Sequence, residues 1–109
     1  MNNLQLQRHA EERGRILTLL ADVEMSSVKS LLFGLELSGY IMSPESLFSH
    51  CRYLQQSGYI RVLRVRDLPG WRADRVTEGN PDELRFAALL PKGLQLASGQ
   101  IEADPMVSF

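Results

Sequence analysis

Apolar residues recur at three- and four-residue spacing in separate stretches of the first half of the chain, which is the pattern of amphipathic helices. A first helix is expected from about Leu4 to Ala21, with its clearest apolar face at residues 16–20. A second helix begins at Ser26 or Ser27, either of which can cap free backbone N–H groups, and ends near Gly39.

The third helix has the clearest start signal in the chain. Ser43 is a good N-cap, Pro44 fits the first helical position, and Glu45 suits the positive end of the helix dipole. Leu47, Cys51 and Leu54 share one face and should point inward, and Gly58 ends the helix. The opposite face is expected to show polar side chains: Ser46, Ser49, His50, Arg52, Tyr53 and Gln56.

The second half of the chain changes character. Residues 59–66 are rich in β-branched and aromatic side chains and predict a strand. Residues 84–90 read as a returning strand, although their alanines and leucines also suit a helix, and the loop 67–83 is long for a simple hairpin. A short helix is expected over residues 91–97. The pattern thus predicts one domain over residues 1–99 and a flexible tail over residues 100–109.

Composition narrows the possible functions. The chain has 109 residues, with 44% hydrophobic and 23% charged, which fits one small globular domain. It shows neither an apolar run of about 20 residues nor a secretion signal, so we expect a cytoplasmic protein that does not enter a membrane. One cysteine and two histidines do not reach metal-ligand spacing, and no catalytic grouping stands out. We therefore expect no enzyme activity, metal, cofactor or small-molecule ligand.

The distribution of charge along the chain says more about function than the net charge does. The net charge of −1 argues against non-specific coating of nucleic acid, which needs a large positive excess. Between residues 61 and 75, however, five arginines face only two aspartates, a local charge of +3. These arginines are Arg61, Arg64, Arg66, Arg72 and Arg75. A site-specific nucleic-acid binder with its positive charge on one face remains compatible with this pattern.

The order of three helices, an arginine-rich hairpin and a short helix is the layout of a winged helix-turn-helix, an α+β fold. The segment from Ser43 to Ile60 resembles the recognition helix and wing entry of winged-helix regulators of the arsenic-repressor-like and PadR-like group. The segment from Leu89 to Gly99 resembles their wing exit, although Leu90 stands where a threonine is usual. The chain is also similar to small winged-helix proteins of Mu-like bacteriophages, which share its length and its Gly-Leu-x-x-Ala-x-Gly ending.

The resemblance implies a transcriptional regulator that binds double-stranded DNA, with the third helix in the major groove and the wing on the backbone. It implies that the third helix contacts DNA through Ser46, Ser49, His50, Arg52 and Tyr53. It implies that the wing contacts phosphates through Arg64, Arg66, Arg72 and Arg75. Because one small reading head contacts few bases, we expect a homodimer, with the first helix and the C-terminal tail as its contacts.

Several residues allow a second interpretation. His50 is a DNA contact, a pH-sensitive switch or a solvated histidine of the helix face, and Cys51 is either a core residue or a redox sensor. Trp71 is a wedge at the wing tip, a group that stacks on a ligand, or a cover for the base of the hairpin. The arginine cluster either contacts phosphates or pairs with Glu78, Asp82 and Glu83 on the returning arm. The near-neutral charge also keeps open a module for protein interaction or assembly, such as a phage accessory protein, without DNA binding.

Overall fold

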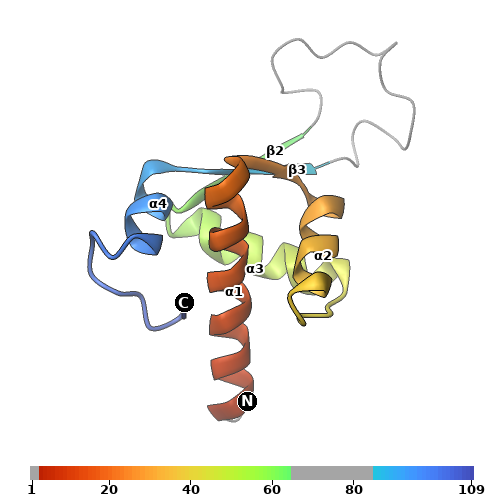
Figure 1. Ribbon diagram of the computed structural model, residues 1–109, viewed down its shortest axis with the longest axis horizontal. Coiled ribbons are helices and arrows are strands. Elements are labelled where there is room, and N and C mark those ends of the chain that lie inside the picture. Colours follow the sequence, from red (N-terminus) through yellow and green to blue (C-terminus); the bar gives the residue numbers. More distant parts are fainter. Residues whose placement is uncertain (1–2, 65–84) are drawn as a thin grey trace.

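The computed structural model describes residues 3–64 and 85–109, which form four helices and one three-stranded antiparallel sheet (Figure 1). The fold is therefore α+β, as the sequence predicts. The elements follow in the order α1 Asn3–Val23, β1 Met25–Ser27, α2 Val28–Leu37, α3 Pro44–Gln56, β2 Ile60–Arg64, β3 Arg85–Leu89 and α4 Pro91–Ala97.

Local signals account for the helix boundaries. The Ser27 hydroxyl accepts a hydrogen bond from Ser30 N at the start of α2, and the Ser43 hydroxyl accepts one from Ser46 N at the start of α3. Gly39 and Gly58, which follow these two helices, have φ of 91° and 82°, a region that favours glycine. The starts and stops of both helices agree with the sequence pattern to within two residues.

The sheet contains a strand that the sequence analysis did not predict. Strand β1 has three residues, and its Ser26 lies opposite Ala87 of β3. Strand β3 pairs on its other edge with β2, where Val62 also lies opposite Ala87, so that the strand order is β1-β3-β2. The returning segment is thus a strand, and of the two interpretations left open for residues 84–90 the helix is wrong.

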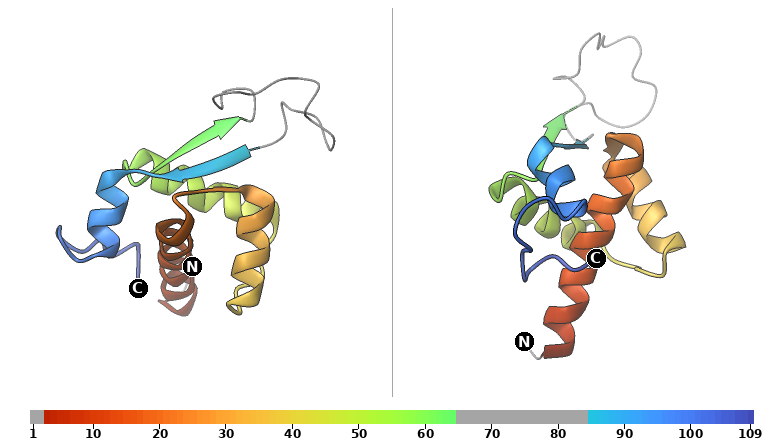
Figure 2. Two further views of the ribbon diagram at one scale, coloured as in Figure 1. Left: turned by 45° about the horizontal axis from the view of Figure 1, so that its top comes forward. Right: turned by 60° about the vertical axis from the view of Figure 1, so that its left-hand side comes forward.

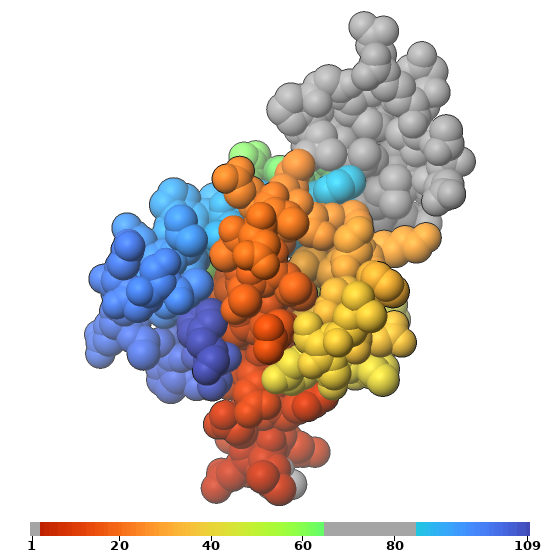
Figure 3. Space-filling model, in the orientation of Figure 1, coloured from red at the N-terminus to blue at the C-terminus, as the bar shows by residue number. Residues whose placement is uncertain are grey.

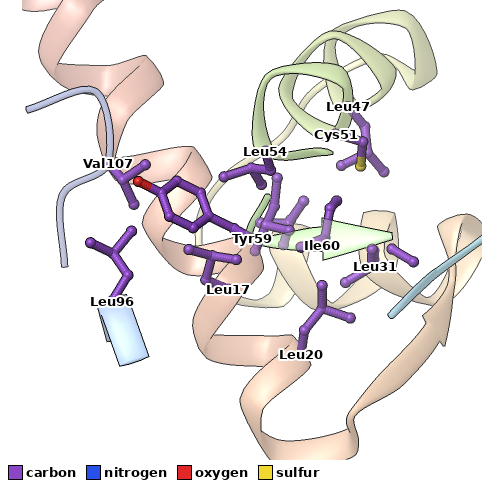
Figure 4. Close-up of a cluster of buried hydrophobic side chains, with 13 residues drawn as sticks. Leu17, Leu20, Leu31, Leu47, Cys51, Leu54, Tyr59, Ile60, Leu96 and Val107 are labelled. Atoms are coloured by element: carbon purple, nitrogen blue, oxygen red, sulfur yellow. The ribbon is translucent and has the colours of Figure 1, made fainter. Parts of the chain in front are cut away.

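The core lies where α1, α2 and α3 meet the inner face of the sheet. Leu17 and Leu20 of α1, Leu54 of α3 and Ile60 of β2 are fully buried there (Figure 4). Burying each such side chain contributes about 2 kcal/mol through the hydrophobic effect. The same packing fixes α3 against α1, α2 and the sheet through Leu47, Cys51 and Leu54, and the remaining side chains of α3 lie outside the core.

The C-terminal segment packs on the body, contrary to the expectation of a loose tail. Val107 is buried in the core beside Leu96 and Tyr59, and Ser108 N donates a hydrogen bond to the Ala10 carbonyl of α1 at 2.9 Å (Figure 4). The tail crosses α1 at Gly14, where a Cβ atom would collide with the Ser108 carbonyl oxygen. A glycine that weakens an isolated helix is therefore required here by tertiary packing.

Candidate nucleic-acid interface

One face of α3 points away from the core and into solvent. Glu45, Ser49, Arg52 and Gln56 follow one another at three- and four-residue spacing and are all exposed. The structure thus leaves Ser49 and Arg52, which the sequence predicts as contact residues, on a surface open to a partner. Ser46 is also exposed, at the side of this face nearest α1.

A groove of about 520 Å³ runs between this helix and the hairpin. Its α3 wall is formed by Phe48, Cys51, Arg52 and Gln55, and its sheet wall by Val62 and Arg85. The Gln55 side-chain oxygen accepts a hydrogen bond from Val62 N at 2.7 Å, which holds the start of β2 beside the helix. The left view of Figure 2 shows β2 and β3 running beside α3. The polar helix and the hairpin therefore lie side by side.

Two arginines line this groove, one from α3 and one from β3, and a third lies on the neighbouring strand. Ile60, Val62 and Arg64 alternate with outward residues and so share the face of β2 that contains the groove wall. Arg85 of β3 lies directly opposite Arg64 in the strand register, and Arg52 approaches from α3. Cross-strand neighbours have Cβ atoms about 5 Å apart, so the Arg64 and Arg85 side chains leave the sheet close together on the same face. Arg85 is a candidate that the sequence analysis missed.

The opposite flank of α3 is closed by α1, and His50 is the residue most affected. Its side chain is 4% exposed, its Nε2 lies 3.5 Å from Glu12 Oε1, and the His9 ring centroid is 5.4 Å away. Burial and the nearby Arg13 charge lower the pKa of His50 below its ordinary value, which favours the neutral imidazole. The buried position of His50 contradicts two of its sequence interpretations, a DNA contact and a solvated histidine, whereas a pH-sensitive switch stays a prediction.

Tyr53 is held by the C-terminal segment. Its hydroxyl donates a 2.9 Å hydrogen bond to Asp104, which also accepts one from the Tyr59 hydroxyl at 2.9 Å. The Arg13 guanidinium stacks over the Tyr53 ring, 4.6 Å from its centroid. Burial, together with the bond to Asp104, raises the pKa of Tyr53. The expectation that Tyr53 faces DNA fails, because its half-buried side chain serves to fasten α3 to the tail.

The Asp104 carboxylate is the centre of that closed flank. Partial burial acts to raise its pKa, but the hydrogen bonds from Met106 N and the two tyrosine hydroxyls outweigh burial and hold the pKa below its usual value. Arg13 adds a hydrogen bond from its guanidinium to the Met106 carbonyl at 3.1 Å. The flank formed by α1 and the tail is thus a network of internal contacts that holds Tyr53, beside a cleft of about 270 Å³ that His9, Glu12 and His50 line.

Cys51 lies on the floor of the open groove but is only 3% exposed. Burial raises the pKa of its thiol to about 11, so almost no thiolate is present near neutral pH. This favours the core interpretation of Cys51 over a redox sensor. Within residues 3–64 and 85–109, no group of three or more His, Cys, Asp or Glu side chains has the geometry to hold a metal ion.

Part of the predicted interface lies outside the described residues. This applies to Arg66, Arg72 and Arg75, to Trp71, and to the loop 67–83 with its acidic residues. The described part of the chain contains no helix with the length and apolar character required to cross a bilayer. Comparisons with protein families, with characterised proteins and with solved structures gave no significant match to this chain.

Proposed function

We propose that this chain is a winged-helix DNA-binding protein, and that it acts in the cytoplasm as a transcriptional regulator rather than as an enzyme. The element order and the strand order β1-β3-β2 support this fold, as does the short link of residues 38–43 between α2 and α3. In this arrangement α3 enters the major groove and the β2–β3 hairpin lies against the sugar-phosphate backbone. Because one fold serves many functions, the proposed DNA binding is argued from the groove between α3 and the hairpin and not from the fold.

The observation that carries the proposal is that Arg52 and Arg85 line one groove between α3 and the hairpin, with Arg64 opposite Arg85 in the strand register. Guanidinium groups bind phosphate oxygens with paired hydrogen bonds, and fixing them on a helix and two strands limits their freedom before binding. Positive charge that is concentrated in this way attracts DNA even when the net charge is −1.

Among the exposed residues of α3, some would read the base sequence and others would position the helix on the DNA backbone. Ser49 and Gln56 carry short or amide side chains that can hydrogen-bond to base edges. Arg52 has the reach to contact either a guanine or a phosphate, whereas Arg64 and Arg85 are at the hairpin and suit phosphates. Binding is therefore expected to combine a modest sequence preference with a clear dependence on salt.

A fluorescence-anisotropy titration with random duplex DNA tests this proposal. At about 50 mM salt the wild-type chain should bind, and its affinity should fall steeply towards about 200 mM as phosphate contacts are lost. The double variant Arg52→Ala/Arg85→Ala should bind about tenfold or more weakly and show a lower salt slope, by about 0.9 for each phosphate contact removed.

Arg15→Ala is the matched control, because Arg15 is an exposed arginine of α1 near Thr18 and Phe109, at a different pocket. It should bind DNA like the wild type. Absence of binding by the folded wild-type chain at low salt would overturn the proposal. Equal losses in the Arg15 and groove variants would show that binding follows total charge and not the groove.

One observation favours a second function, the binding of a protein segment. Phe48 is 38% exposed on the groove wall and faces Val62, so the groove has an apolar stretch between its arginines. An acidic peptide with one large apolar side chain would match that surface. Under this alternative, Phe48→Ser abolishes partner binding, and the chain shows no affinity for duplex DNA at low salt.

A further inference from the structure

The cleft of about 270 Å³ beside the closed flank of α3 lies where α1 and α3 meet. Each of these two helices contributes three polar residues to its wall: His9, Glu12 and Arg13 of α1, and Ser46, Ser49 and His50 of α3. Ile41 and Met42, in the linker between α2 and α3, complete the wall. Figure 3 shows the end of α2 and this linker, in yellow, lying directly against the red half of α1. The cleft is therefore a polar hollow with one apolar side.

The His50 imidazole presents an unused hydrogen-bond acceptor at this cleft. Its Nε2 lies 3.5 Å from the Glu12 carboxylate, so the ring proton belongs on Nε2 and Nδ1 keeps its lone pair. Because burial lowers the pKa of His50, the ring is neutral at about pH 7.5. Nδ1 is buried, and no group of residues 3–64 or 85–109 donates a hydrogen bond to it. An unpaired buried polar atom is costly, so this nitrogen calls for a donor.

Arg13 presents the complementary group on the same wall. Its guanidinium donates a hydrogen bond through Nη1 to the Met106 carbonyl and stacks on the Tyr53 ring. Its Nε is also buried, and it finds no acceptor within the described part of the chain. The wall thus offers one unused donor and one unused acceptor. A hydroxyl group suits both, because its oxygen can accept one hydrogen bond and donate another.

The charges around the cleft favour a neutral ligand. Glu12 is negative and Arg13 is positive, so a bound anion would be repelled by the first and a bound cation by the second. Ser46 and Ser49 add hydroxyls that can donate or accept. The volume lies just below the range of pockets for drug-sized molecules, so the ligand must be smaller than these.

We propose that this cleft binds a neutral polyhydroxylated molecule of about monosaccharide size, with ligand hydroxyl groups on His50 Nδ1 and Arg13 Nε. The cleft is too small for a duplex or a folded protein, so this flank is closed to macromolecules and open to a small molecule. The sequence analysis expected no such ligand, because the wall comes from three separate segments that only tertiary packing brings together. The cleft shares no wall residue with the α3–hairpin groove, so the proposal does not depend on DNA binding.

An NMR titration of the ¹⁵N-labelled full chain tests the proposal at about pH 7.5, with D-glucose, D-ribose and myo-inositol each added to about 50 mM. At least one of these three probes should shift the backbone amide signals of Ser49 and His50 to saturation. Acetate and methylammonium, an anion and a cation, should leave both signals in place. The proposal is overturned by the absence of a saturating shift with all three polyols, or by a charged probe that binds as tightly as any of them.

The ring nitrogens of His50 report the expected contact directly. In the free protein, ¹⁵N spectra of the imidazole should show a proton on Nε2 and none on Nδ1. At saturation with the polyol that binds, the Nδ1 signal should move upfield, since the nitrogen then accepts a hydrogen bond, and the proton should stay on Nε2. An Nδ1 signal that keeps its position at saturation would contradict the assigned contact.

Two variants and a control locate the binding. His50→Phe keeps a ring but removes the acceptor, and it should weaken polyol binding about tenfold. Ser49→Ala removes a hydroxyl from an exposed position, so it should fold normally and weaken binding about threefold. It therefore keeps the test decisive if His50→Phe does not fold. Ser98→Ala, at an exposed serine that ends α4 away from the cleft wall, should bind like the wild type.

Circular dichroism identifies the variants that fold, and only these are compared. Unchanged affinity in the folded cleft variants, or an equal loss in Ser49→Ala and Ser98→Ala, overturns the proposal. None of these experiments contains DNA, so their outcome and that of the proposed DNA binding are independent.

Discussion

The two flanks of α3 serve different purposes. On one flank, His50 and Tyr53 are enclosed by α1 and by a tail segment about fifty residues further along the chain. On the other flank, Arg52 and Gln55 face the hairpin across an open groove. The comparison teaches that polarity alone does not identify a binding face, because both flanks carry polar side chains and only one leaves them accessible.

The difference has a thermodynamic consequence. Tyr53, Tyr59 and Asp104 of the closed flank are already hydrogen-bonded to one another, so changes there should lower the free energy of unfolding. On the open flank, Gln55 holds β2 through its hydrogen bond to Val62 N, but Ser49 and Arg52 are exposed, so changes at these two residues should affect partner binding and leave stability within about 0.5 kcal/mol. The following predictions test this separation, beginning with the largest effect.

Gly14→Ala should open the closed flank. The added Cβ collides with the Ser108 carbonyl oxygen, so the tail must move and Val107 must leave the core. We expect a loss of about 2 to 3 kcal/mol in the free energy of unfolding by urea, despite a helix-propensity gain of about 1 kcal/mol.

Gly34→Ala is the control for this change, because a Cβ at this α2 position would meet only the flexible end of the Leu19 side chain of α1. This variant should be neutral or slightly stabilising. If Gly14→Ala is equally well tolerated, the tail does not pack across α1 as described.

Asp104→Asn should weaken the same flank by a smaller amount. Tyr53 and Tyr59 both donate to Oδ2, whereas Met106 N donates to Oδ1, so the single amide oxygen of the variant cannot accept all three hydrogen bonds and at least one donor loses its partner. We expect thermal or urea unfolding to show a loss of about 1 kcal/mol. Glu102→Gln, at an exposed acid of the same tail, should have no measurable effect. Identical stabilities for the two variants would argue against the Asp104 network.

A pH titration should show a smaller effect that depends on His50. Because burial and Arg13 lower its pKa, the unfolded chain binds a proton at this residue that the folded chain does not. Stability from the buried neutral imidazole is complete above about pH 6.5 and decreases as the pH falls below that value.

The measurement is the urea midpoint at about pH 7.5 and about pH 5.5, compared between variants. His50→Gln should remove most of the decrease, whereas His9→Gln should retain it, since His9 is only half-buried beside the same cleft with Glu12. A decrease that persists unchanged in His50→Gln would assign the pH dependence to other groups.

Local sequence signals predicted α3 because its start and end depend on adjacent residues. Ser43, Pro44 and Gly58 act within one or two turns of the helix, so their effect can be read from the sequence. Strand β1 has no comparable signal, since three residues form a strand only through pairing with β3. The same reason explains why Arg85 was missed: its importance comes from lying opposite Arg64.

The closed flank could not be predicted from helical periodicity. The inward stripe of Leu47, Cys51 and Leu54 is correct, but His50 lies at its edge, where burial depends on how α1 crosses the helix. Tyr53 depends in turn on Asp104, which no local pattern connects to it. Tertiary contacts over long sequence separations therefore decided which polar residues of α3 remain available.

Two valines provide the most direct test of the central claim that the α3–hairpin groove is the partner-binding face. Val62 forms a wall of that groove, whereas Val107 is buried under the tail on the closed flank. In a methyl NMR titration with duplex DNA, we predict that the Val62 signals shift progressively and saturate while the Val107 signals stay in place. Shifts of Val107 with an unchanged Val62 would contradict the account.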